Sequence, residues 1–381
     1  MNVNTKNNIS NTNNPKKKSK HIFYFDALRA FAILSVIIFH VSIRSQSLML
    51  GGYGVIPNLN WFIGDFLGVS LRTGVDVFLM LSGALSLGRV WDIKPFLQKR
   101  LTRIVLPFVF WALILSCFIL LLQFYYPNTI HVIDPFNISN ALGYIKGAFL
   151  ATSDMGFHTY WFFWMIIGTY LIMPVLNKWL LHSDLKEAEY FLAIWLIACI
   201  FNFTLYQDFP IKITYFSGPI GMVVLGYYLR HTKRKIFNNI WVAILLIIVG
   251  VILLTFGSYL MSSPDSLYKF SRYSIFMVIE VTGIFLLFKN IGNYNININF
   301  FKNPNGIFRK AVLSLATYSY GLYLTHAVIL DVIKKLTIHF GFFNNYILVT
   351  IFFFISTLLV SWALLAILNR IPYVRNIIGA K

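Results

Sequence analysis

Three ionisable residues share one long apolar segment near the N-terminus: Asp26, Arg29 and His40. Arg29 and His40 are eleven residues apart, which is three helical turns plus about 20°, so a helix would place both on one face, about 16 Å apart along its axis. Asp26 precedes Arg29 by three residues, a spacing that allows an ion pair on that face. Imidazole accepts a proton near neutral pH, so His40 is a candidate general base.

A carboxylate in the next apolar segment, Asp76, is the candidate partner of His40. If that segment runs in the opposite direction, Asp76 reaches the depth of His40. A carboxylate that faces an imidazole fixes its tautomer and raises its basicity. Structural interpretations stay open: His40 as a neutral histidine that ties helices together, Asp26 and Arg29 as a structural ion pair, and Asp76 as a helix cap.

A basic group precedes the third apolar segment: Lys99, Arg100 and Arg103. Arg100 and Arg103 share a helix face at a spacing of three residues. Two guanidinium groups side by side suit phosphate, which they bind as bidentate forks. The alternative is a basic anchor at the cytoplasmic membrane surface, which is the more common use of such residues.

Two further ionisable residues lie within later apolar segments, Glu280 and His326. Glu280 is a candidate catalytic acid, acceptor ligand or half of a buried pair. His158 stands where a fourth segment begins, which favours an interfacial role. The eight His residues are scattered without metal-ligand spacing, and the two Cys residues fall inside apolar runs. We therefore expect no metal site and no disulfide framework.

The composition sets the environment of these residues. Of 381 residues, 58% are hydrophobic and 12% are charged, about half the charged share of a soluble domain. This excludes a soluble globular protein and predicts an all-α integral membrane protein with several spans. The net charge of +19 comes from basic residues between the apolar runs, which indicates membrane topology and not nucleic-acid binding.

Ten membrane spans are expected when about 20 apolar residues are allowed for each. Residues 1–20 are predicted to be a disordered, basic cytoplasmic tail, and residues 21–381 a single polytopic membrane domain. Most of the 32 Lys and Arg residues then fall on one side, so both termini are predicted to be cytoplasmic. The predicted spans are 22–44, 68–88, 103–125, 158–180, 188–206, 213–230, 237–260, 270–289, 311–335 and 345–369.

Five sequence blocks together resemble the membrane-bound acyltransferase 3 family. They occur in the family's order, which makes the resemblance more specific than any single block. The ten predicted spans agree with the family's ten-helix core. The blocks are Phe25–Ala32 with His40, Gly74–Gly83, Lys99–Ile104 with Pro107, Tyr160–Phe163 with Tyr170–Pro174, and Ser319–His326.

The resemblance implies an O-acyltransferase of the stand-alone surface-polysaccharide type, multi-pass in the cell membrane. Its donor would be cytoplasmic acyl-CoA, chiefly acetyl-CoA, with no permanently bound cofactor. Its other partners would be a surface glycan or lipid-linked glycan, membrane lipid and a polysaccharide-synthesis complex. The resemblance further implies roles for named residues: His40 as essential histidine, Arg29 as its companion, Arg100 and Arg103 near the CoA phosphates, and Asp76 and His326 in the catalytic surroundings.

Two other functions remain open from sequence. A transporter or flippase of a glycan or small anion could use the polar stripe as its pathway, with Arg29 holding an anion. Residues 1–190 and 191–381 share no motif, which disfavours a carrier built from two repeats. An inactive structural partner of a polysaccharide-synthesis complex is the third candidate.

In the enzyme, CoA phosphates would bind Arg100, Arg103 and Lys99, and the pantetheine arm would pass Arg29 to reach His40.

Overall fold

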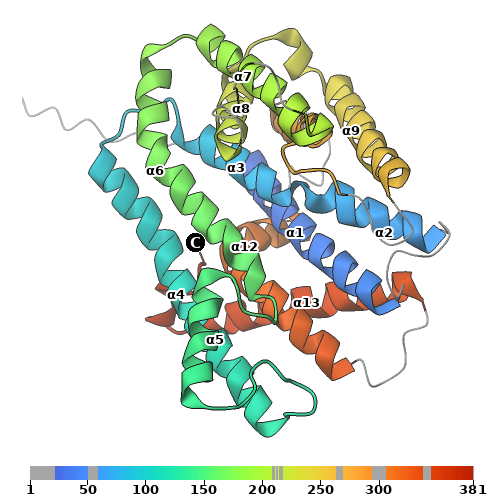
Figure 1. Cartoon of the computed structure of the whole chain (residues 1–381). Helices are drawn as coiled ribbons and strands as arrows, with labels where there is room; N and C mark the ends of the chain where they lie inside the picture. The colour runs from blue at the N-terminus through green and yellow to red at the C-terminus, as the bar shows by residue number, and fades with distance from the viewer. Residues whose placement is uncertain are drawn as a thin grey trace, which may run out of the picture.

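A computed structural model describes residues 22–49, 59–207, 211, 213, 218–262, 269–293, 306–337 and 345–380. All regular secondary structure in these ranges is helical, which confirms the predicted all-α fold (Figure 1). The predicted tail 1–20 lies outside the described residues. The helices are α1 (Phe23–Met49), α2 (Leu59–Val69), α3 (Gly74–Ser86), α4 (Ile93–Tyr125), α5 (Ile138–Leu150), α6 (Trp161–His182), α7 (Leu185–Ile200), α8 (Pro219–His231), α9 (Ile240–Met261), α10 (Ile275–Asn293), α12 (Ile307–Thr337) and α13 (Tyr346–Leu368).

Every predicted span overlaps helical structure in the described ranges, and eight helical segments there are long and apolar enough to cross a membrane. The other two predicted spans coincide with α8 and α12. The helix α8 has 13 residues, fewer than a full crossing requires. The helix α12 has 31 residues but is rich in Ser, Thr and Tyr and also contains His326. Because α12 packs against α1, α4 and α13, protein and not lipid surrounds its polar residues.

The second span differs from the prediction of one helix over 68–88. It runs from Leu59 to Ser86 and consists of α2 and α3, joined by a 3₁₀ turn over Ser70–Thr73. The helix α3 begins at Gly74, where a Cβ atom would lie 2.4 Å from the backbone oxygen of Ala32 on α1. Only glycine permits this approach.

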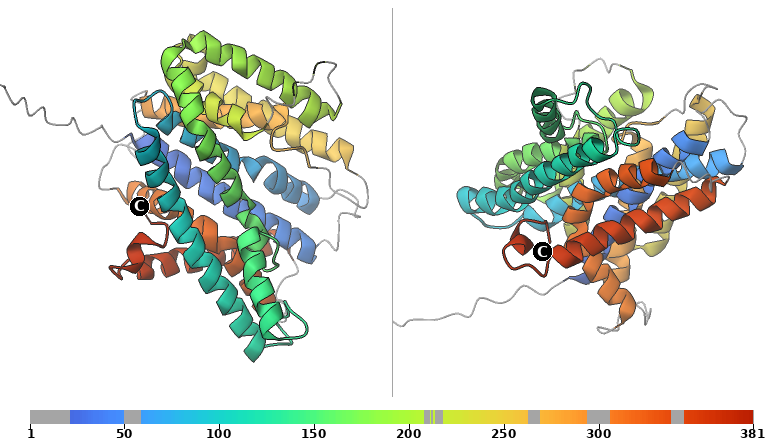
Figure 2. Two further views of the ribbon diagram at one scale, coloured as in Figure 1. Left: turned by 60° about the vertical axis from the view of Figure 1, so that its left-hand side comes forward. Right: turned by 90° about the horizontal axis from the view of Figure 1, so that it is seen from below.

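The helices α1 and α12 run in the same direction, as the charge pattern predicts. At one end of the bundle, Arg309 at the start of α12 lies 4.1 Å from the ring centre of Phe23 at the start of α1. At the other end, Arg44 of α1 pairs with Asp331 of α12. The helices α1 and α12 are therefore parallel neighbours, as Figures 1 and 2 also show. We call the end with Phe23 the inner end, since the charge pattern assigns it to the cytoplasm.

Candidate functional site

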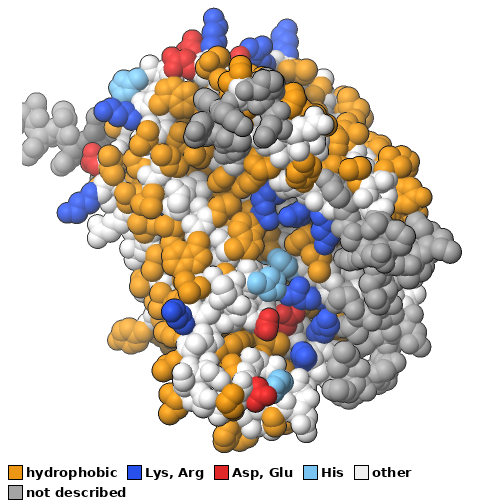
Figure 3. Space-filling model, viewed as in Figure 1, with side chains coloured by type: hydrophobic (Ala, Val, Ile, Leu, Met, Phe, Trp, Pro, Cys, Tyr) orange, Lys and Arg blue, Asp and Glu red, His pale blue; other side chains and the backbone are white. Residues whose placement is uncertain are grey.

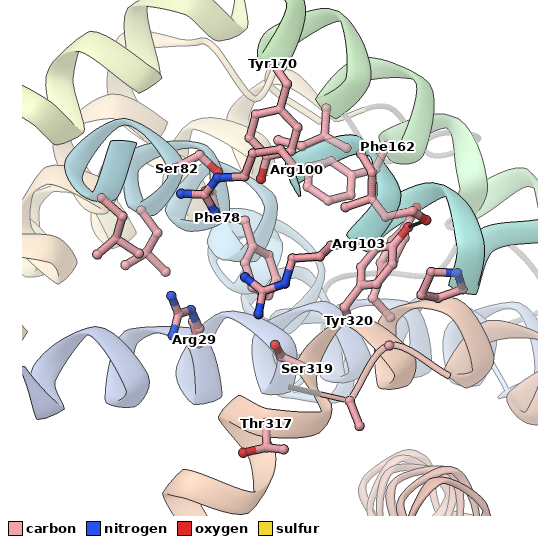
Figure 4. Close-up of a pocket in the computed structure, with 18 of the residues that line it drawn as sticks. Arg29, Phe78, Ser82, Arg100, Arg103, Phe162, Tyr170, Thr317, Ser319 and Tyr320 are labelled. Carbon is pink, nitrogen blue, oxygen red and sulfur yellow. Dashed lines mark hydrogen bonds between the residues drawn. The ribbon is translucent and has the colours of Figure 1, made fainter. Parts of the chain in front are cut away.

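The inner half of the bundle contains a cavity of about 390 Å³. Four arginines line it: Arg29 from α1, Arg100 and Arg103 from α4, and Arg375 from the segment that follows α13. Figure 4 shows that Arg29 and the two α4 arginines point into the same space from opposite sides. A cavity lined by several guanidinium groups can bind phosphate groups.

The side chains of this cavity are held by specific contacts. The Nη1 atom of Arg29 lies 2.8 Å from Oδ1 of Asp26, which confirms the predicted ion pair. The Nη2 atom of Arg100 donates a hydrogen bond of 2.9 Å to Oγ of Ser86. The Arg100 guanidinium also lies 5.9 Å from the ring centre of Tyr170. These contacts reduce the number of conformations the cationic groups would lose on binding a ligand.

Lys99 does not belong to this cavity, although the sequence grouped it with Arg100 and Arg103. Its side chain is exposed and it is not one of the lining residues. The spacing explains the difference: residues 100 and 103 share a face of α4, whereas residue 99 is rotated by about 100° from residue 100.

Arg375 is a cavity residue that sequence reasoning missed. It lies after the last span, where it was counted only as a topology signal. The segment folds back because the indole Nε1 of Trp111 donates a hydrogen bond of 3.1 Å to the backbone oxygen of Ile378. Gly379 and Ala380 also line the cavity. No periodic pattern in this short segment predicts that return.

Three histidines from separate elements meet farther along the bundle. The ring of His40 on α1 lies 5.2 Å from that of His326 on α12 and 6.5 Å from that of His158, which precedes α6. The sequence predicted the first two as candidates and favoured an interfacial role for His158. Neither this cluster nor any other group of His, Cys, Asp or Glu in the described ranges is placed to hold a metal ion.

The proton on His326 can be assigned from its neighbours. Its Nδ1 lies 2.8 Å from the backbone oxygen of Tyr323 and 3.0 Å from that of Leu322. Because carbonyl oxygens only accept hydrogen bonds, Nδ1 carries the proton and donates it. The Nε2 atom then has a free lone pair, and it has no hydrogen-bond partner in the structure. The buried Nδ1 of His40 is also without a partner.

An ion pair supports the outer side of this histidine cluster. The guanidinium of Arg44 on α1 donates hydrogen bonds of 2.7 and 3.2 Å to the two carboxylate oxygens of Asp331 on α12. It also lies 3.3 Å from Nε2 of His158. Sequence reasoning singled out neither Arg44 nor Asp331, because their pairing depends on the parallel packing of α1 and α12.

One aromatic residue connects the arginine cavity with the histidine cluster. Tyr323 lines the cavity and lies one helical turn before His326 on α12. Its hydroxyl donates a hydrogen bond of 2.6 Å to the backbone oxygen of Thr159. Its ring packs 5.2 Å from that of Phe162. The cavity and the cluster are therefore neighbouring compartments, and Tyr323 and Phe162 lie at their boundary.

The structure does not pair Asp76 with His40. Asp76 is fully buried in the first turn of α3, and neither carboxylate oxygen accepts a hydrogen bond. The ionisable groups that interact electrostatically with Asp76 are Arg272, Arg72 and Glu280. Glu280 packs against Gly250 of α9 and lies beside Asp76 instead of the histidines. The two carboxylates thus group with Arg72 and Arg272 and make no hydrogen bond to the histidines.

A comparison with protein families supplies independent information. The model of a family described as an acyltransferase domain matches residues 22–366. The matched region contains every residue of the histidine cluster and the whole cavity except its C-terminal wall. No curated protein and no solved structure matches the chain.

Proposed function

The chain belongs to the membrane-bound acyltransferase 3 family, and we propose that it transfers an acyl group from cytoplasmic acyl-CoA to a hydroxyl of a surface polysaccharide or its lipid-linked precursor. Acetyl is the first acyl group to test. That it is a multi-pass membrane acyltransferase follows from the family and the spans. The observation that carries the finer proposal is the position of a four-arginine cavity next to a histidine cluster.

The cavity supports acyl-CoA as the donor. Acyl-CoA carries phosphate groups at one end of a flexible arm and the thioester at the other. Arg29, Arg100, Arg103 and Arg375 are suited to the phosphates. Because Arg29 lies about 16 Å along α1 from His40, we assign it to donor binding and not to the reacting centre. The arm would then extend toward Tyr323, with the thioester beside the histidines.

The histidine cluster supports transfer to a hydroxyl. A hydroxyl is a weak nucleophile and needs a base. An unprotonated imidazole nitrogen, Nε2 of His326 or a ring nitrogen of His40, would accept its proton. The hydroxyl oxygen then bonds to the acyl carbon, the carbon–sulfur bond breaks, and the proton passes to the CoA thiolate. Transient acylation of His40 would allow the same transfer in two steps.

Replacing the central histidine tests this proposal. In purified protein supplied with radiolabelled acetyl-CoA and a glycan acceptor, His40→Ala should lower transfer at least about 100-fold, the usual contribution of a positioned base. The matched control is His182→Ala, because His182 is exposed at the inner end of α6. Equal activity of His40→Ala and the wild type would refute the catalytic role of His40.

The donor site has its own test. Arg100→Gln, Arg103→Gln and Arg375→Gln should each raise KM for acetyl-CoA by about 10-fold, since each removes a charge-assisted hydrogen bond to phosphate. Lys99→Gln removes the same charge one residue away but leaves the cavity intact, so its KM should change little. If Lys99→Gln and Arg100→Gln have the same effect, phosphate binding in this cavity is wrong.

A further inference from the structure

Two arginines near the histidine cluster do not line the donor cavity, Arg72 and Arg272. Arg72 is in the 3₁₀ turn between α2 and α3, and its Nη1 donates a hydrogen bond of 2.8 Å to the backbone oxygen of Phe270. Arg272 follows two residues later, and its guanidinium lies 4.1 Å from the ring centre of Trp161. The proposed donor reaction uses neither residue.

Both guanidinium groups retain unused hydrogen-bond donors. Nε of Arg72 and Nη1 of Arg272 are buried and have no hydrogen-bond partner. Buried N–H groups almost always have partners, so an unsatisfied pair needs an explanation. The neighbouring carboxylate of Asp76 does not supply one, because neither of its oxygens accepts a hydrogen bond. The two cations also repel each other, a cost that a bound anion would offset.

Other basic groups increase the positive charge of this region. Lys269 lies in the loop before α10, where burial and the charge of Arg72 lower its pKa. Arg44 stands on the other side of the histidines. Figure 3 shows Lys and Arg side chains gathered together with His side chains on this face. An anion that reaches this face is attracted toward the cluster.

The arginine pair lies beside the proposed reacting centre. The charge of Arg272 acts on both His40 and Asp76. The Arg72 guanidinium lies 6.0 Å from the ring centre of Phe39, the residue before His40. Arg72, Arg272 and His40 are partly exposed, and His158 is exposed to a greater extent. A molecule that approaches from this side can therefore contact the arginines and His40 together.

We propose that Arg72 and Arg272 bind an oxyanion of the acceptor glycan and thereby hold its hydroxyl beside His40. This inference rests on the proposed function, because it places the acceptor opposite the acyl-CoA cavity. The oxyanion is either the carboxylate of an acidic sugar or the phosphate of a lipid-linked glycan. Planar guanidinium forks suit both groups, and the Trp161 ring holds the Arg272 plane in place.

Small glycosides test the arginine pair directly. The probes are methyl glucuronide, glucose 1-phosphate and the neutral methyl glucoside, titrated calorimetrically into the protein in lipid nanodiscs. The wild type should bind at least one anionic probe more tightly than methyl glucoside. Arg72→Gln and Arg272→Gln should each weaken that binding by about 10- to 100-fold. The preferred probe identifies the source of the oxyanion: carboxylate indicates an acidic sugar and phosphate indicates a lipid-linked precursor.

Variants of the donor cavity separate the two proposals. Arg272→Gln should lose the anionic probe and keep acetyl-CoA affinity, whereas Arg100→Gln should do the reverse. Any of three results would overturn the inference. Probe binding could be lost in Arg100→Gln alone, neutral and anionic probes could bind equally, or binding could be unchanged in both Arg72→Gln and Arg272→Gln. Absence of acetyl-CoA binding in the wild type would refute the proposed donor instead. If Arg272→Gln does not fold, Arg272→Lys keeps the charge and should still weaken probe binding, because it loses the fork.

Discussion

At the scale of single residues, backbone carbonyl groups fix the tautomer of His326. A carboxylate, Asp76, was expected to fix the tautomer of His40. The Nδ1–H of His326 donates to the carbonyl oxygens of Leu322 and Tyr323, which fixes the tautomer and leaves Nε2 unprotonated. No hydrogen bond fixes the tautomer of His40 through its Nδ1. In the proposed reaction, Nε2 of His326 would therefore be the better-defined base, whereas the tautomer of His40 is not fixed through Nδ1.

Amide replacements distinguish the two nitrogens of His326. An Asn side chain reproduces the Nδ1–H donor but supplies no base at the position of Nε2. We expect His326→Asn to keep the thermal stability of the wild type within a few degrees and to lower transfer about 100-fold or more. His326→Ala should lose both activity and stability. Wild-type transfer rates in His326→Asn would show that Nε2 takes no proton.

Sequence reasoning succeeded where one helix carries the relevant residues. The pairs Asp26–Arg29 and Arg100–Arg103 each follow from a spacing of three residues, and the structure places each pair together. Contacts between helices lie beyond such spacing. His158 joins His40 only because a 3₁₀ turn brings it against α1 and α12.

At the scale of the elements, the broken second span places the two groups of arginines at different depths. A window of hydrophobic residues detects a span but not the 3₁₀ turn at Ser70–Thr73, because four residues change the average over a whole span only slightly. The turn puts Arg72 beside Phe39 and starts α3 at Gly74, against the backbone of α1. The position of α3 in turn places Phe78 and Ser82 in the arginine cavity.

A single methyl group at the start of α3 tests this packing. Gly74→Ala would bring a Cβ atom to 2.4 Å from the oxygen of Ala32 and 2.7 Å from Val36, so α3 must move. Overpacking of this kind costs about 1–3 kcal/mol, which should lower the unfolding temperature and the transfer rate together. Gly168→Ala in α6 is the matched control, since no atom lies within 4 Å of its added Cβ.

The expected results for these two glycines are opposite in sign. Alanine is the better helix former by about 1 kcal/mol where space allows, so Gly168→Ala should be neutral or slightly stabilising. Thermal unfolding of both purified variants in the same detergent provides the measurement. A Gly74→Ala variant as stable as Gly168→Ala would mean that α1 and α3 do not pack as closely as described.

At the scale of the whole molecule, apolar side chains cover the faces of several long helices, while some ionisable groups lie inside the bundle. Exposed large hydrophobic residues line α4, α9 and α13, as expected for helices that face lipid. Besides the buried carboxylates Asp76 and Glu280, the internal polar groups include two neighbouring compartments, a basic cavity toward the inner end and a histidine cluster beyond it. The composition predicts the apolar, lipid-facing surface. The arrangement of the compartments depends on how α1, α3, α4, α6 and α12 pack together.

Two compartments on opposite sides of Tyr323 predict a reaction with a fixed direction. Proteoliposomes, with orientation read from an N-terminal epitope tag, would receive acetyl-CoA on one side only. Transfer should occur when acetyl-CoA is added on the tagged side and the glycan on the other side. The tagged side is the one nearer the cavity lined by Arg100, Arg103 and Arg375. Because salt screens exposed charges, raising ionic strength should increase KM for acetyl-CoA. Equal transfer with the donor on either side would show that the arginine cavity does not select the face from which acyl-CoA binds.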